Sequence, residues 1–331
     1  MEERNTDKPF MLCCHFKATH EPWDFPERMK HLYDDVTFPE PDTMMEFDTI
    51  ASGRTFTGRQ LENMGWRWEQ ASKGPWWCQY PELPFSTEGM DSISARKKIY
   101  QKMNKKIICA AVPPSTTISA DCSAIWTKKG LAKEYHRHFM YQTKDTSWGE
   151  HGFFDKRMMY EEPLRMPFVI RYPKEIPAGT RNKDIILNTD FAAMLADYAH
   201  VKTPNKSQGQ SFRDNLAGNT PENWRKDMYY RYWTHHTIRP AHIGIRNERY
   251  KLMFLYGNKL DRPPVRTILR LLRLGSSMTC RKTRTNHNAY KDAEYAPVIK
   301  EMKARLLELR KEANDEDRNS EVMQEIIKKN F

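Results

Sequence analysis

One continuous run, from Trp148 to Pro173, constrains the fold of this chain more than any other stretch. It begins with Gly-Glu-His-Gly and a polar turn that carries Lys156 and several acids, and it continues into an apolar strand, Pro167 to Ile170. A charged loop that leads into a buried strand is how α/β enzymes place reactive side chains at the edge of a sheet. The run therefore predicts an α/β chain in which Lys156 is the first candidate site residue and His151 a second.

Two further segments have a comparable character. Residues 8–23 read as an apolar strand that runs into a turn with two basic candidates, Lys17 and His20. Residues 224–252 contain Trp-Arg-Lys-Asp-Met-Tyr-Tyr-Arg-Tyr-Trp and then Pro-Ala-His-Ile-Gly-Ile-Arg, in which the His is His242. Each segment alone is weak evidence for any particular family of proteins, whereas three such segments in one order are strong evidence.

The three segments, in this order, resemble the sulfatase family of the alkaline-phosphatase-like superfamily, specifically the C-terminal portion of arylsulfatase-like and iduronate-sulfatase-like enzymes. The resemblance covers about two thirds of the chain, and Thr19 stands where the family usually has Pro. It implies that Lys156 contacts the sulfate ester and that His20 contacts the sulfate or the leaving group. It also implies substrate-binding roles for Lys17, His151 and His242.

Sulfate-ester cleavage needs a nucleophile, a cation, fixed positive donors and an acid for the leaving alcohol. Sulfatases use a formylglycine made from Cys or Ser in a Cys/Ser-x-Pro-x-Arg motif, with calcium held by hard oxygen ligands. None of the six Cys here is followed by x-Pro-x-Arg. The metal ligands are unknown: Asp145 is a weak candidate, so the resemblance implies calcium while its binding by this chain stays in doubt.

Composition and charge exclude several classes of function. With 39% hydrophobic and 29% charged residues, the 331-residue chain has a globular composition, and no apolar run approaches the ~20 residues of a transmembrane helix. Residues 262–286 hold seven Arg or Lys and no acid, and so supply most of the net charge of +11. The rest is nearly balanced, so we expect no nucleic-acid partner. Residues 1–7 are polar and acidic, so we expect no signal peptide before Lys8. The compartment is unknown, although sulfatases are often periplasmic, extracellular or lysosomal.

Two stretches, residues 112–148 and 262–286, depart abruptly from the family pattern, which then resumes at once. Codons read one frame away can spell family-like segments there, including Asp-Gln near Tyr141 to Trp148 and Tyr-Asp-Leu near Met278 to Thr285. We hypothesise a frame shift, by sequencing error or gene decay, with ordinary divergence or an insertion as the alternative. The codons of the gene decide between them.

A polar stretch that follows Pro204 and contains Gly209, Gly218 and Pro221 predicts a domain boundary there. The resemblance implies that residues 1–205 are the C-terminal part of the catalytic domain, with a partial mixed sheet flanked by helices, and that residues 206–331 are a smaller domain with an antiparallel sheet and a helix. The tail after Asn314 is charged and is expected to be frayed. Helices are expected over 92–111, 184–200 and 296–313, and strands over 8–16, 167–172, 228–233, 243–245 and 250–256.

From the family resemblance we expect a sulfuric ester hydrolase that acts on a sulfated small molecule or glycan. Because the nucleophile motif is missing, the 331 residues alone are expected to be an inactive fragment. One alternative is a noncatalytic protein that binds sulfated glycans through Lys156 and His20. Another is a basic partner of membranes or nucleic acid built on residues 262–286.

Overall fold

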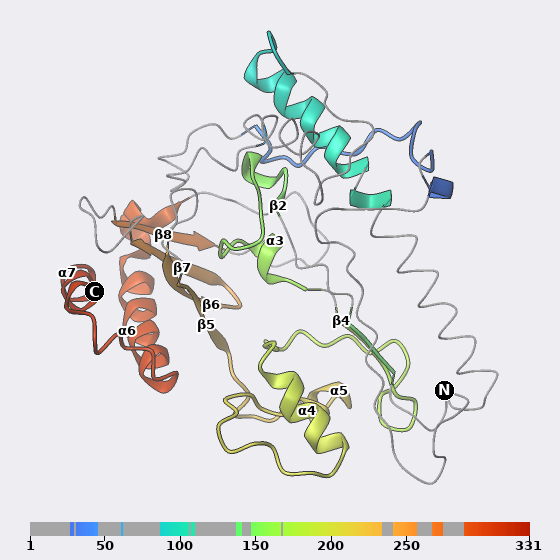
Figure 1. Ribbon diagram of the computed structural model, residues 1–331. Coiled ribbons are helices and arrows are strands. Elements are labelled where there is room, and N and C mark those ends of the chain that lie inside the picture. The colour runs from blue at the N-terminus through green and yellow to red at the C-terminus, as the bar shows by residue number, and fades with distance from the viewer. Residues whose placement is uncertain are drawn as a thin grey trace.

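The computed structural model describes residues 27–29, 31–45, 61, 87–105, 107–109, 137–140, 147–166, 168–233, 241–256, 267–273 and 288–331. No helix among these residues is long and apolar enough to cross a membrane. In chain order the elements are η1 (Glu27–Met29), a helix over residues 92–105 and 107–109, β1 (Arg137–Met140), β2 (Ser147–Trp148), η3 (Glu150–Gly152), β3 (Phe154–Asp155), α3 (Glu161–Leu164), β4 (Phe168–Arg171), α4 (Asp190–Tyr198), α5 (Arg213–Leu216), β5 (Asp227–Tyr232), β6 (His242–Asn247), β7 (Tyr250–Tyr256), β8 (Thr267–Arg273), η4 (Ala289–Lys291), η5 (Ala293–Tyr295), α6 (Ala296–Glu312) and α7 (Glu321–Asn330) (Figure 1).

A four-stranded antiparallel sheet in the order β5-β6-β7-β8 forms the centre of the C-terminal region. A tight turn joins β6 to β7, and in it the Asn247 side chain accepts hydrogen bonds from the backbone N–H groups of Arg249 (2.9 Å) and Tyr250 (2.7 Å). This hairpin confirms the two strands expected from the aromatic and β-branched residues of this region. Strand β8 lies within the atypical segment 262–286 and pairs with β7 along its whole length.

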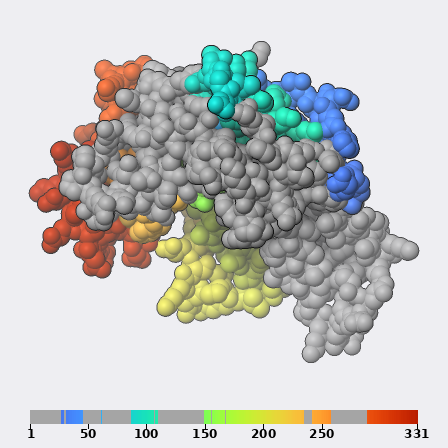
Figure 2. Space-filling view, turned by 45° about the horizontal axis from the view of Figure 1, so that its top comes forward, coloured from blue at the N-terminus to red at the C-terminus, as the bar shows by residue number. Residues whose placement is uncertain are grey.

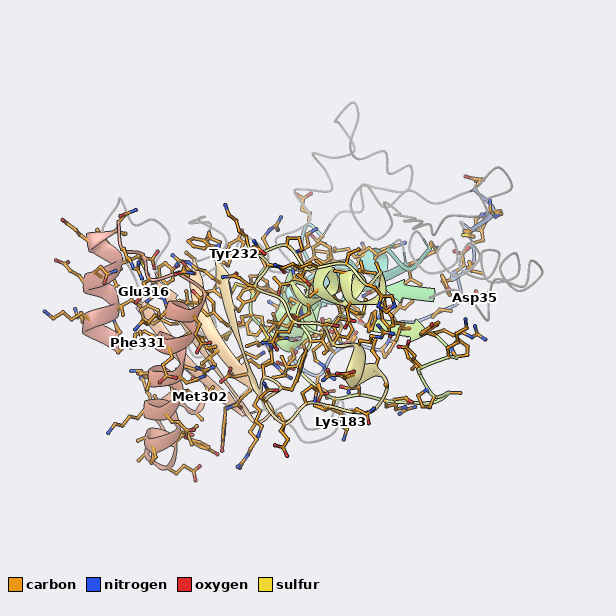
Figure 3. The ribbon with its side chains drawn as sticks, turned by 90° about the horizontal axis from the view of Figure 1, so that it is seen from below. Asp35, Lys183, Tyr232, Met302, Glu316 and Phe331 are labelled. Atoms are coloured by element: carbon orange, nitrogen blue, oxygen red, sulfur yellow. The ribbon has the colours of Figure 1, made fainter. Side chains whose placement is uncertain are left out.

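One face of this sheet is covered by α6 and α7. Ile299, Met302 and Leu306 recur along α6 at helical spacing and pack on the sheet residues Ile243 and Phe254. Figure 3 shows Met302 on the helix beside the sheet. The expected helix over 296–313 and the expected antiparallel sheet are therefore confirmed.

The tail after Asn314 is folded, which corrects the expectation that it is frayed. Arg231 on β5 donates to Asp315 and to Asp317, both at 2.6 Å, and Arg310 also donates to Asp317 at 2.6 Å. Charge alone suggested a solvated tail, but these carboxylates are paired with two nearly buried guanidinium groups.

Helix α7 then returns to the sheet. The Ser320 hydroxyl accepts a hydrogen bond from the backbone N–H of Met323 and so begins the helix. Met323 is fully buried, and the ring of Phe331 packs edge-on against Phe254 with centroids 5.1 Å apart (Figure 3). The apolar residues of α7 thus complete the core on this face of the sheet.

Outside the C-terminal region, α4, α5 and β4 form a separate packed region, drawn in yellow and green in Figure 1. Its yellow part is also seen in Figure 2. Its core contains Met194, Phe212 and Trp224, with Phe168 of β4 packed against them. The helix expected from residue 184 begins only at Asp190, because the Asp190 carboxylate accepts a hydrogen bond from the backbone N–H of Leu187 (2.7 Å) and so fixes a non-helical turn before it.

The α/β fold class is confirmed by this mixture of packed helices and sheets. All strand pairs of the described residues are antiparallel, including β1 with β4 and β2 with β3. The expected strand 8–16 of the mixed sheet lies outside the described residues. The division into domains at residues 205 and 206 stays a prediction.

Candidate functional site

Lys156 lies in a segment, residues 153–164, that is packed on the second face of the four-stranded sheet. Phe153, Met158, Met159 and Tyr160 are buried there, against Met253 and Leu255 of β7. At Gly244 on β6 an added Cβ would lie 2.3 Å from the sulfur of Met159, so the absence of a side chain lets the segment approach the strand. Lys156 itself is partly exposed, and the residues two positions before and after it, Phe154 and Met158, are buried.

The turn before Lys156 is fixed by close packing against the helix over residues 92–105 and 107–109. Gly152 has a φ of 62°, and an added Cβ would lie 2.2 Å from Nη1 of Arg96. Arg96 is fully buried and donates to the backbone carbonyl of Met44 at 2.6 Å. Glycine at position 152 is therefore required by backbone conformation and by space.

His151 is placed inside this turn. Its side chain is 2% exposed, its ring stacks on Tyr160 with centroids 4.4 Å apart, and its Nε2 lies 4.0 Å from Oε2 of Glu162. Its backbone has a φ of 59° and its N–H donates to the hydroxyl of Thr43. A buried ring next to a carboxylate can orient neighbouring groups, and the substrate-binding role assigned to His151 stays a prediction.

Glu161 ties the segment to the sheet through two cations. Its carboxylate accepts two hydrogen bonds from Arg246, both at 3.0 Å, and lies 2.7 Å from Nζ of Lys251. Lys251 is 1% exposed and Glu161 is 12% exposed. Burial alone would raise the pKa of Glu161, but Lys251 and Arg246 outweigh it and lower the pKa to about 2.

Acid should destabilise the protein through this carboxylate. Because the folded pKa of about 2 lies below the ordinary value of 4.5, the stabilisation is complete above pH 4.5 and is lost as the pH falls through 2. The difference corresponds to about 3 kcal/mol in the free energy of unfolding. Urea unfolding at pH 7, 4 and 3 follows the loss, which should reach about 2 kcal/mol by pH 3, and Glu161→Gln should show a flatter dependence on pH. An unchanged slope in that variant would contradict the assignment.

His242 lies on the same face of the sheet as the Lys156 segment. It is fully buried at the start of β6, paired in register with Tyr232, and its ring stacks on Tyr230 with centroids 5.5 Å apart. The Tyr230 hydroxyl donates to the backbone carbonyl of Arg157 at 3.0 Å. One tyrosine thus contacts both His242 and the residue that follows Lys156, which brings two sequence-predicted site residues into one neighbourhood.

The other candidates are not described. Lys17, His20 and Asp145 lie outside the described residues. Among the residues that the structure does describe, no group of three or more His, Cys, Asp or Glu side chains could hold a metal ion. The calcium implied by resemblance therefore has no ligand set in that part of the chain.

Sequence reasoning missed Tyr230, Glu161 and Lys251. The alternation of aromatic residues over 228–233 does place Tyr230 and Tyr232 on one face of a strand. This alternation does not give the register between strands, and the pairing of β5 with β6 is what shows that the same face carries His242. For Lys251, a charged residue inside an apolar strand was the available signal for a buried ion pair.

Comparison with known proteins places this geometry in a family. Residues 149–312 match the family model described as N-sulphoglucosamine sulphohydrolase, C-terminal. An N-acetylglucosamine-6-O-sulfatase of Bacteroides thetaiotaomicron is 30% identical over 355 aligned residues, which take in 96% of this chain and 60% of that protein. The chain belongs to the sulfatase family. It corresponds to the C-terminal portion of the family, as its three motif segments predict.

Solved structures support the same assignment. A protein bound to its substrate D-glucosamine-2-N,6-O-disulfate superposes on this sulfatase chain with a TM-score of 0.80 and 26% identity, over 97% of this chain and 69% of that one. A phosphonate monoester hydrolase from Silicibacter pomeroyi shares the fold, with a TM-score of 0.59 and 16% identity over 88% of this chain and 54% of that one. The sulfatase chain spans 60% of the Bacteroides relative's length and 41% of an arylsulfatase of Clostridium perfringens, which is 23% identical over 68% of this chain.

Proposed function

We propose that this protein acts in the hydrolysis of sulfate esters, with sulfated glucosamine as the substrate class. The observation that carries the proposal is the Lys156 segment, which lies on the sheet within the region matched by the sulphohydrolase family model. The names of two relatives support the substrate class, since one is an N-acetylglucosamine-6-O-sulfatase and the other is solved with a disulfated glucosamine.

The chemistry assigned to Lys156 is electrostatic. The nonbridging oxygens of a sulfate ester carry negative charge, and an ammonium group offers a full positive charge and three N–H donors. A donor lowers a barrier most when it is already in place before the reaction. Buried Phe154 and Met158 flank Lys156 two residues away on each side, so the backbone that carries the ammonium group is held in position.

The supporting roles follow from the resemblance. In this proposal His20 contacts the sulfate or the leaving group, and Lys17, His151 and His242 contribute to substrate binding. The 331 residues contain no Cys or Ser followed by x-Pro-x-Arg. We therefore assign to this chain alone the binding of a sulfated sugar without turnover, which is also what a noncatalytic glycan-binding protein would do.

Binding and turnover can be measured on the purified chain. Glucosamine-6-sulfate should bind more tightly than glucosamine in calorimetric titration, and Lys156→Met should weaken that binding about tenfold through the loss of charge-assisted hydrogen bonds. Lys183→Met is the matched control, because Lys183 is exposed on the loop before α4 (Figure 3) and should change nothing.

Two results would count against the proposal. Equal affinity for glucosamine and its 6-sulfate would remove the substrate class. Release of the phenol from an aryl sulfate well above a blank would leave the proposed hydrolysis standing and would overturn the assignment of binding without turnover to this chain alone.

A further inference from the structure

The tyrosines on β5 differ in what they contact. Tyr230 points to the face that carries the Lys156 segment, donates its hydroxyl proton to the carbonyl of Arg157, and stacks on His242. Its neighbour Tyr229 points to the opposite face and donates to the carboxylate of Asp315 at 2.6 Å. Each of these hydroxyls donates a hydrogen bond to a residue far away in the sequence. Of the two, the Tyr230 hydroxyl is the one that reaches the candidate site.

Tyr230 is constrained on the strand that carries it. It is paired across the sheet with Gly244, where Met159 fills the space that a side chain would occupy. The segment is therefore fixed at Met159 by packing and at Glu161 by Arg246 and Lys251. The Tyr230 hydroxyl fixes it at Arg157, the residue that follows Lys156.

We propose that Tyr230 is a positioning residue that sets the place of Lys156 relative to His242. The inference rests on the proposed function, because Tyr230 acts through Lys156 and His242, the residues to which that proposal assigns sugar binding. The ring fixes the imidazole by stacking, and the hydroxyl fixes the backbone next to the ammonium group. Loss of the hydroxyl alone should leave the fold and the stacking in place and should displace Lys156.

The test compares Tyr230→Phe with Tyr229→Phe. Each variant removes one hydroxyl of a partly buried tyrosine from the same strand, so each should lower the melting temperature slightly. Affinity for glucosamine-6-sulfate should fall about fivefold in Tyr230→Phe, as expected for one neutral hydrogen bond, and should stay unchanged in Tyr229→Phe. Equal losses in the two variants, or none in Tyr230→Phe, would overturn the proposal.

A second measurement needs no ligand. In the unliganded chain, Tyr230→Phe should shift the amide resonances of Lys156 and Arg157 while the ring resonances of His242 stay close to their original positions. Tyr230→Leu, which also removes the stacked ring, should shift the His242 resonances as well. If the unchanged chain fails to bind the sulfated sugar, the proposed function fails. The resonances then decide the positioning role, and unshifted Lys156 and Arg157 signals in Tyr230→Phe would reject it.

Discussion

Glu161→Ala should lower the free energy of unfolding by about 3–5 kcal/mol, the cost of leaving buried charges without their partner. Lys251 is 1% exposed and would remain next to Arg246 with no carboxylate between them. The substitution should also release α3 and the end of the segment that carries Lys156. Chemical denaturation at neutral pH measures the loss.

The matched control for Glu161→Ala is Glu316→Ala. Glu316 also pairs with an arginine, Arg318, at 2.5 Å, but the arginine side chain is 72% exposed, so this change should cost less than about 1 kcal/mol. A double variant, Glu161→Met with Lys251→Met, should recover much of the stability lost in Glu161→Ala, because it removes the unpaired ammonium group as well. If Glu161→Ala and Glu316→Ala lower the free energy of unfolding by similar amounts, the buried ion pair stabilises the protein no more than the exposed one.

Asp190→Ala should be similarly destabilising, by about 3–5 kcal/mol, in the region of α4 and α5. The Asp190 side chain is fully buried, and its carboxylate accepts hydrogen bonds from the backbone N–H of Gln210 (2.9 Å) and Leu187 (2.7 Å) and from Arg225. Alanine would leave these donors without an acceptor in a buried place. Thermal unfolding followed by circular dichroism reports the change.

Asp214→Ala gives the comparison for Asp190→Ala. Asp214 lies in α5 of the same region but is exposed, so its removal should change the melting temperature little. Asp190→Asn should be intermediate, because its amide keeps one acceptor oxygen and loses the charge that pairs with Arg225. If Asp190→Ala melts at the same temperature as Asp214→Ala, the carboxylate is not what holds residues 187 and 210 together.

Local sequence predicted the C-terminal elements well. The helix with its apolar stripe along 296–313 and the two strands over 243–245 and 250–256 were predicted from spacing and composition, and all are present. Such elements follow from neighbours within about one helical turn or one tight turn, so they can be predicted without knowing the rest of the fold.

Predictions went wrong where a distant partner sets the local structure. Asp190 starts α4 later than periodicity suggests, because its carboxylate binds the backbone N–H of Leu187 and is held in that place by Gln210 and Arg225, much later in the chain. Asp315 and Asp317 order the tail because Arg231, more than eighty residues earlier, holds them. A charge pattern cannot show which of its charges are paired.

The sequence alone determined the family, the α/β class and Lys156 as the first candidate, because motif residues and apolar periods are written directly in the order of the chain. Tertiary structure decided that Tyr230 lies between His242 and the Lys156 segment, and that Glu161 is held by the buried Lys251 and the partly buried Arg246. These contacts depend on strand register and on which face of the sheet each segment covers. Both are set by packing between residues far apart in the chain, and no local pattern specifies them.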